Sequence, residues 1–238
     1  MSRLNQIFRA NVTNRQSWVK NQLKKILPGA KILDVGCGGQ PYRKYCDHLE
    51  YKAHDFAMLD ASTQINEGKY GFLDYVSDIS HIPEKDCYFD VILNTEVLEH
   101  VPEPIQAIKE MYRLLKPGGK LFITAPLNSF QHQTPYHFYG GFSRFWYERN
   151  LKEAGFGNIK VEQNGGFFMF FGQECQRFNR ILFRRRTLKT PLRWLLMPLE
   201  IFTTSVFAVL LPLICHFLDE LVYTEDYTIG YHVTAEKQ

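Results

Sequence analysis

The chain has 238 residues, of which 45% are hydrophobic, 22% charged and 15% aromatic, and its formal net charge is +3. This length suits one α/β domain, alone or with a modest insertion, and the composition excludes a low-complexity protein. So weak a positive charge gives no argument for nucleic acid as a partner. The five cysteines form no C-x-x-C pair, so we expect no disulfide framework and no metal site. Residues 1–25 lack the apolar core of a signal peptide, which favours a cytoplasmic location.

The apolar residues predict alternating strands and helices along most of the chain. Residues 4–27 have roughly helical spacing, which Pro28 and Gly29 end. The remaining predicted elements are a strand running into a glycine turn over 31–39, strands near 51–54, 75–79, 89–94, 120–126 and 158–163, helices over 104–115 and 143–154, and a last strand over 228–235. Alternation of this kind predicts an α/β fold with a largely parallel sheet covered on both faces.

The glycine turn at residues 36–39 lies where a strand passes into the next element, a place where backbone approaches a ligand closely. A dinucleotide fingerprint would require a third glycine at position 41, and that residue is Pro41. Asp34, just before the turn, would repel a pyrophosphate and attract an ammonium or sulfonium centre. Asp55, at the end of the second strand, is placed to accept hydrogen bonds from both hydroxyls of a ribose, or else to cap the strand.

Three segments resemble the class I S-adenosylmethionine (SAM)-dependent methyltransferases. They are residues 32–39 (ILDVGCGG), residues 89–101 (FDVILNTEVLEHV) and residues 114–121 (LLKPGGKL), in the family's order and with ordinary spacing. The resemblance covers about residues 30–165 and the last strand. It implies a Rossmann-like seven-stranded sheet, mostly parallel with an antiparallel last strand, and helices on both faces. It is to the broad group that includes the ubiquinone and menaquinone biosynthesis methyltransferases.

The resemblance also implies which residues bind SAM as the cofactor. The turn formed by Gly36, Cys37 and Gly38, with Asp34 before it, would hold the methionine part. Asp55 would bind the ribose, Asp78 and Ile79 would meet the adenine, and the region around Asn94 would lie near the sulfonium. Gln40 departs from the family, which often has glycine at this position.

Methyl transfer from a sulfonium requires a nucleophile placed in line with the methyl group, and a general base only if the acceptor must lose a proton. His137, in a loop rich in aromatic residues after the fifth strand, is our first candidate for that base. His100, at the start of the helix after the fourth strand, is the second. Each histidine has a purely structural alternative, in which it ties a loop or a helix end.

The segment between the last two strands is unusually long, and we predict a helical insertion over residues 166–225. Residues 177–193 carry seven Lys or Arg and no acidic residue, and residues 201–218 carry no charged residue. Arginines beside an apolar helix predict a peripheral membrane contact through residues 177–218, at the inner face of a membrane. A lid on the domain, a subunit contact or a true membrane span are the alternatives.

We therefore expect a single methyltransferase domain over 1–238, which begins with a helical segment at 1–29 and acts on a small-molecule acceptor. The insertion alone suggests a lipid-linked or glycolipid acceptor. An RNA methyltransferase is the second hypothesis, although the basic residues adjoin an apolar run and no RNA-binding module is recognisable. A non-catalytic SAM-binding or membrane-scaffold protein is the third. The sequence does not indicate an oligomeric state.

Overall fold

The computed structural model describes residues 7–58, 70–183, 190–222, 224 and 227–238, and backbone alone for 190–195. The chain divides into two compact units. One comprises residues 15–163 and 230–238 and is called the sheet unit here. The other comprises residues 1–14 and 164–229 and is called the helical unit. The predicted insertion, 166–225, lies within the helical unit.

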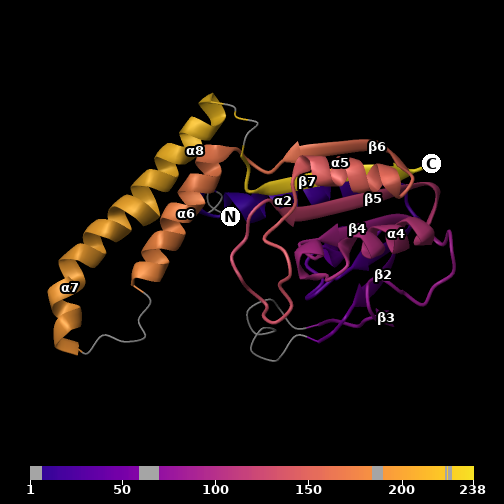
Figure 1. Ribbon diagram of the computed structural model, residues 1–238, viewed down its shortest axis with the longest axis horizontal. Coiled ribbons are helices and arrows are strands. Elements are labelled where there is room, and N and C mark those ends of the chain that lie inside the picture. The colour runs from indigo at the N-terminus through magenta and orange to yellow at the C-terminus, as the bar shows by residue number, and fades with distance from the viewer. Residues whose placement is uncertain (1–6, 59–69, 184–189, 223, 225–226) are drawn as a thin grey trace. The chain divides into compact units, whose positions relative to one another are not determined.

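The sheet unit is built on one seven-stranded sheet with the strand order β3-β2-β1-β4-β5-β7-β6 (Figure 1). Its strands are β1 (Lys31–Val35), β2 (Glu50–Asp55), β3 (Tyr75–Val76), β4 (Phe89–Thr95), β5 (Leu115–Pro126), β6 (Phe156–Gln163) and β7 (Gly230–Lys237). Strands β1 to β5 pair in parallel, whereas β7 runs antiparallel to both β5 and β6. The mostly parallel sheet with an antiparallel last strand is therefore confirmed.

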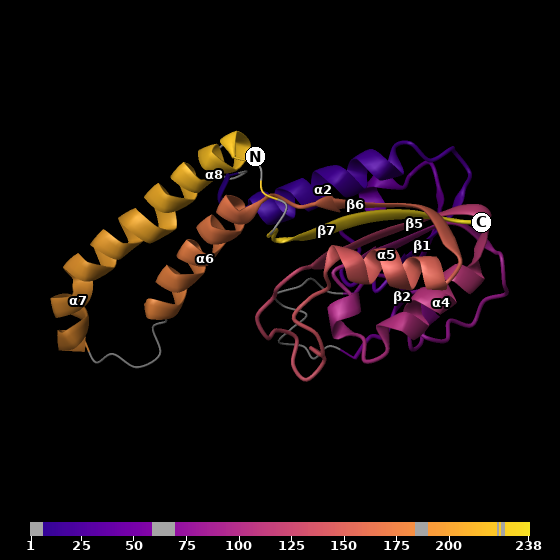
Figure 2. The ribbon, with the colours of Figure 1, turned by 45° about the horizontal axis from the view of Figure 1, so that its top comes forward.

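Helices cover both faces of this sheet, as Figure 2 shows. On one face, Val19 and Leu23 of α2 (Ala10–Leu23) pack against Ile32, Val91 and Phe122 of the strands. On the other face, α4 (Pro104–Leu114) and α5 (Arg144–Glu153) bury Ile108, Met111, Tyr147 and Leu151 in the larger core. The near-continuous apolar strands between these layers are what a sheet buried on both faces requires.

The ends of these helices follow local signals in the sequence. Pro104 occupies the first turn of α4, where its missing N–H leaves no bond unmade. The Ser143 side chain accepts a hydrogen bond from the Trp146 N–H and so caps α5. The helix predicted over residues 4–27 is shorter than expected: α2 ends at Leu23, and residues 1–6 lie outside the described part of the chain.

The helical unit contains α6 (Phe167–Leu182), α7 (Thr190–Thr203), the π-helical stretch η3 (Thr204–Leu210) and α8 (Leu211–Leu221). The last three form one continuous helix, and α6 packs beside it along α8 and η3. The Gly172 backbone lies close to Pro212 and Cys215, so a side chain at that position would crowd the contact. The pair leaves the sheet after β6 and returns at β7, as a helical hairpin.

The longer arm of this hairpin is apolar and largely exposed. Within the described residues, the helix Leu196–Leu221 is the one segment long and apolar enough to cross a membrane, judged by length and composition. Only 17% of its most apolar stretch is buried, which is unlike the core helix of a soluble protein. Of the predicted basic stretch, residues 184–189 lie outside the described part of the chain.

Candidate functional site

A cavity of about 480 Å³ lies at the carboxyl ends of β1, β2 and β4. Parallel sheets bind ligands at this edge, next to the point where the strand order reverses, and here that point lies between β1 and β4. The volume falls in the range of small-molecule sites. The lining residues are Arg15, Gly36, Cys37, Gly38, Gly39, Pro41, Tyr42, His54, Asp55, Phe56, Met58, Tyr70, Asp78, Ile79, Thr95, Glu96, Val97, His100, Val101, Pro102, His132, Gln133, Tyr136 and Phe138.

The glycine turn forms one wall of the cavity, as predicted. Gly36 has a φ of +71°, and a Cβ there would lie 2.4 Å from a Val97 methyl carbon. Gly38 has a φ of +48°, but a Cβ there would meet nothing within 4 Å. Gly36 is therefore required by both conformation and space, whereas Gly38 is required by conformation and leaves room for a ligand.

Gln40, the departure from the family pattern, has the left-handed conformation that glycine adopts without strain, with a φ of 55°. Two side-chain bonds stabilise it there. Its amide donates to the Phe72 carbonyl at 2.7 Å, and its amide oxygen accepts from the Arg43 guanidinium at 2.9 Å. The bond to Phe72 anchors the turn to the segment before β3.

Asp55 closes the end of β2 and supports the turn. One carboxylate oxygen accepts from the Gly38 N–H at 2.9 Å, and the other accepts from the Ala57 N–H at 2.9 Å. A carboxylate oxygen can accept more than one hydrogen bond, so Asp55 can hold the turn and still bind ligand hydroxyls. At the neighbouring edge, the Asp78 carboxylate accepts from the Ser80 N–H and hydroxyl, which lowers its pKa.

Two predicted cofactor residues lie behind the cavity wall instead of on it. Asp34 is buried and accepts from the Tyr51 hydroxyl at 2.7 Å, while its other oxygen has no hydrogen-bond partner among the described residues. Burial raises the pKa of Asp34 to about 7. Asn94 is fully buried and donates to the Val35 carbonyl at 3.1 Å, so it ties β4 to β1. Thr95, Glu96 and Val97, just beyond Asn94, line the cavity.

Arg15 and Glu96 form a pair on the cavity wall that the sequence did not point to. The Arg15 guanidinium lies 2.7 Å from one Glu96 carboxylate oxygen, and the Thr124 hydroxyl donates to the other at 3.1 Å. Glu96 has a φ of 54°, a strained conformation that persists only where its surroundings hold it. Arg15 comes from α2, far away in sequence, and this distance explains why no local pattern revealed the pair.

At the other end of the cavity, loop 127–141 brings histidines beside the short helix η2 (Leu98–His100). The rings of His100 and His132 are 4.6 Å apart, and His137 lies 5.7 Å from His100 and 4.9 Å from His132. His100 and His132 line the cavity, whereas His137 does not and lies 3.0 Å from the Ser129 hydroxyl. Burial lowers the pKa of His100 to about 4 and raises that of the adjacent, buried Glu99.

Loop 127–141 is fastened to η2 through backbone groups. The Glu99 carbonyl accepts from the Phe138 N–H at 2.9 Å and from the Tyr139 N–H at 3.2 Å. The Tyr139 hydroxyl donates to the Pro102 carbonyl at 2.9 Å. Across the cavity, the ring of Tyr136 meets that of Phe56 edge-on, with centroids 6.1 Å apart. Aromatic side chains therefore wall the end at which the histidines lie.

Comparisons with known proteins agree with this geometry. A methyltransferase-domain family profile matches residues 8–161. The ubiquinone biosynthesis O-methyltransferase of Xanthomonas campestris pv. campestris (strain B100) is 36% identical over 110 residues, which cover 41% of this chain and 44% of that protein. The chain thus spans about half the length of the curated relatives it matches.

Two solved structures share the fold. A SAM-dependent methyltransferase from Archaeoglobus fulgidus has a TM-score of 0.53 at 16% identity, covering 93% of this chain and 94% of that one. Phosphoethanolamine N-methyltransferase 2 of Haemonchus contortus, in complex with phosphomonomethylethanolamine and S-adenosylhomocysteine, has a TM-score of 0.51 at 20% identity. It covers 94% of this chain and 52% of that one.

The buried carboxyl of Asp34 generates a prediction about pH. Because its folded pKa of about 7 exceeds the ordinary 3.8, the folded state holds a proton that the unfolded state releases. This contribution to stability is complete below about pH 4 and is lost as the pH rises through about 7. Asp34→Asn has no proton to lose at this position, so it should not lose stability in this way. The melting temperature of Asp34→Asn minus that of wild type should therefore increase as the pH rises from about 4 to about 7. Thermal unfolding across the pH series measures it.

Asp47→Asn, which changes an exposed carboxylate, is the matched control. A constant difference in melting temperature between wild type and Asp34→Asn at every pH would show that Asp34 is ionised in the folded protein.

Proposed function

Because this chain belongs to the class I SAM-dependent methyltransferase family, we propose that it transfers a methyl group from SAM to a small-molecule acceptor, and that the acceptor is lipid-linked. The observation that carries the proposal is the cavity at the carboxyl ends of β1, β2 and β4, lined by the glycine turn, Asp55 and Asp78. The family match supports SAM as the methyl donor at the glycine turn. The exposed apolar helices are our reason for proposing a lipid-linked acceptor.

The residues present fit SAM. Asp55, beside the Gly38 N–H, suits the ribose hydroxyls, and Asp78 with Ile79 suits the adenine at the neighbouring edge. The open space over Gly38 admits a ligand where a side chain would otherwise stand. When bound, SAM supplies a methyl group on a positively charged sulfur. The cavity lining holds three carboxylates and one guanidinium, that of Arg15, and this excess of negative charge favours a cation over a phosphate.

The acceptor belongs at the end of the cavity where the aromatic side chains and histidines lie. Phe56, Tyr136 and Phe138 give this end an apolar lining, against which a bound acceptor would displace water and so favour an in-line displacement. An acceptor hydroxyl must lose its proton there, and His137 is the base that we assign to this step. Its ring contacts that of His100, which lines the cavity, with ring centroids 5.7 Å apart, and His137 itself lies just outside the lining.

The helical unit supports a membrane-surface contact. Its exposed apolar side chains include Phe178 and Ile181 on α6 and Ile201, Phe202 and Phe217 on the longer arm, with exposed fractions between 47% and 62%. Monomeric soluble proteins rarely leave so many large apolar side chains on one element in water. Transferring them into the interface of a bilayer removes that exposure.

Basic residues stand beside this apolar surface. A cavity of about 210 Å³ within the helical unit is lined by Arg9, Arg177 and Arg180, together with His216 and the amides of Gln173 and Gln176. Glu174 pairs with Arg177 at 3.2 Å, which leaves an excess of positive charge around the cavity. A lipid phosphate suits this lining, and basic residues add about 1 kcal/mol each near an anionic membrane. We accordingly place the protein at the cytoplasmic face of a membrane.

The first test is cofactor binding. Titration calorimetry should show that wild type binds SAM and that Asp55→Ala weakens the affinity about 10- to 100-fold, since hydrogen bonds to a charged group contribute about 1.5–3 kcal/mol. Asp47→Ala, with its side chain outside the cavity, is the control and should bind as wild type does. Wild type without SAM affinity would remove the proposed function.

The second test concerns the base. His137→Ala should lower kcat by a factor of about 10² to 10⁴, the range for loss of a general base, and leave the affinity for SAM unchanged. His48→Ala, remote from the cavity lining, controls for the loss of a histidine. Turnover is measured with labelled SAM and a lipid extract as the acceptor pool. Unchanged turnover in His137→Ala would make this residue a structural tie to Ser129.

The third test is flotation with lipid vesicles. Wild type should float with vesicles that contain anionic lipid, and replacing both Phe202 and Phe217 by Glu should abolish flotation, because a buried charge opposes insertion. Phe145→Glu is the matched control, since Phe145 is 76% exposed but lies on the sheet unit. Equal flotation of the double variant and wild type would exclude the helical unit as the membrane contact.

A further inference from the structure

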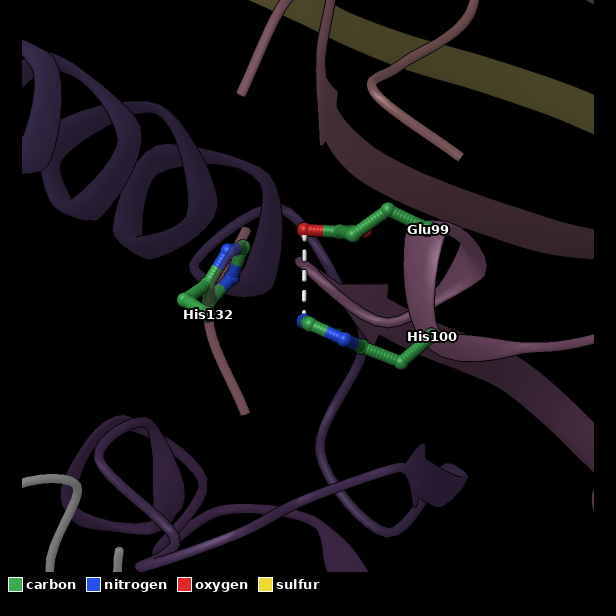
Figure 3. Close-up of side chains that lie close together, drawn as sticks. All are labelled: Glu99, His100 and His132. Carbon is green, nitrogen blue, oxygen red and sulfur yellow. Dashed lines mark ion pairs between the residues drawn. The ribbon is translucent and has the colours of Figure 1, made fainter. Parts of the chain in front are cut away.

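Glu99, His100 and His132 form a cluster at the acceptor end of the cavity. One ligand atom from each of these side chains lies within 4.8 Å of the other two, and the described residues contain no other such group of His, Cys, Asp and Glu. Figure 3 shows the Glu99 carboxylate and the His100 ring, both on η2, turned toward one another with His132 beside them. They come from the carboxyl ends of neighbouring parallel strands, β4 and β5.

His100 is held with one ring nitrogen directed into the cluster. Its Nδ1 contacts the Tyr136 carbonyl, and since a carbonyl oxygen only accepts, Nδ1 carries the hydrogen. The other nitrogen, Nε2, is buried, lies 3.8 Å from a Glu99 carboxylate oxygen and has no hydrogen-bond partner among the described residues. In the neutral ring, Nε2 is an acceptor that faces another acceptor.

His132 repeats this arrangement on the loop. Its Nδ1 donates to the Phe130 carbonyl at 2.8 Å, which leaves Nε2 with a lone pair as well. A histidine that donates one ring N–H to a backbone carbonyl and presents its other nitrogen to a shared centre has the arrangement of a metal-binding histidine. Two histidines of the cluster therefore have the same tautomer for the same reason.

Glu99 completes the cluster with a buried carboxyl group, which a bound cation would hold in its ionised form. Its side chain is 1% exposed, and one of its carboxylate oxygens has no hydrogen-bond partner among the described residues. Buried polar groups are almost always paired, and buried carboxylates are paired or coordinate a metal. The Arg15 guanidinium attracts Glu99 through space, but its ion pair is with Glu96. The carboxyl group and the two lone pairs thus have no positive group bonded directly to them among the described residues.

We propose that Glu99, His100 and His132 bind one divalent transition-metal ion of the Zn²⁺ type at the acceptor end of the cavity. Two imidazoles and one carboxylate are a donor set for Zn²⁺ or Fe²⁺ and unsuited to Mg²⁺ or Ca²⁺, which prefer oxygen ligands. Ligands at about 2.1 Å from a common ion stand at most about 4.2 Å apart. The 3.8 Å between Glu99 and His100 meets this limit, and His132, on an exposed loop, has to move closer.

Such an ion would specify the acceptor, an inference that rests on the proposed function. Three protein ligands leave a position open toward the cavity, and a hydroxyl bound there loses its proton more readily. The site therefore favours methyl transfer to an acceptor hydroxyl oxygen over transfer to nitrogen or carbon. His137, outside the donor set and 4.9 Å from His132, remains available to receive the proton.

Titration with Zn²⁺ alone tests the site. Wild type should bind one ion per chain, and Glu99→Gln and His132→Ala should each weaken the affinity by about 100-fold or more, because removing a ligand exceeds the effect of removing a supporting group. His132 is exposed, so its removal leaves the fold intact, and thermal unfolding verifies this. His48→Ala is the control for adventitious binding and should bind as wild type does.

Equal Zn²⁺ affinity in wild type and His132→Ala, or no binding by wild type, would overturn the site. The titration requires neither SAM nor an acceptor. A protein that does not bind SAM would thus contradict the proposed function but not the ion site. A protein that binds SAM but no Zn²⁺ would contradict the ion site but not the proposed function. Removing the ion with a chelator should reduce methyl transfer about tenfold or more and leave SAM affinity unchanged. Full transfer after chelation would overturn the ion's role at the acceptor.

Discussion

The parallel pairing of β4 with β1 and β5 is the constraint on which the site depends. It places the carboxyl ends of β1, β2, β4 and β5 along one edge of the sheet. Each strand contributes one part of the site there: the glycine turn after β1, Asp55 at the end of β2, Glu96 to His100 after β4 and loop 127–141 after β5. No single segment forms the cavity alone. The four segments make one binding site only because the parallel strands end at the same edge of the sheet.

Charge within the site is arranged in layers. Asp34 and Asn94 lie behind the wall and hold strands and turn, whereas Asp55 and Glu96 lie on it and have partners of their own. Both wall carboxylates have hydrogen-bond or ion-pair partners, whereas Asp34 is buried without a full set of partners, which raises its pKa. The cluster of Glu99, His100 and His132 differs, because one oxygen of the buried Glu99 carboxyl and the Nε2 of His100 have no hydrogen-bond partner among the described residues.

The helical unit differs from the sheet unit in which of its side chains are buried. Its α6 and the helix formed by α7, η3 and α8 bury Gly172, Cys175, Pro212 and Cys215 against each other, and leave most of their large apolar side chains exposed. A water-soluble helix pair would reverse this pattern, with apolar residues between the helices and charged ones outside. This exposed apolar surface is the observation from which we propose a membrane contact.

The sequence by itself determined the strands, most helix ends and the cofactor turn, because these depend on neighbours in the chain. The alternation of apolar runs, Ser143 as a cap and the glycines at 36 and 38 act over a few residues. It showed that Gln40 departs from the family's glycine, but not the contacts with Phe72 and Arg43 that stabilise this residue.

Only the tertiary structure decided which side chains share a space. It placed Asp34 and Asn94 behind the cavity, brought Arg15 to Glu96, and set His132 from a loop against Glu99 and His100. The sequence predicted no metal site because His132 lies about thirty positions from Glu99 and His100, and the three follow no metal-ligand spacing. Their proximity comes from strand pairing, a long-range interaction that no local pattern encodes.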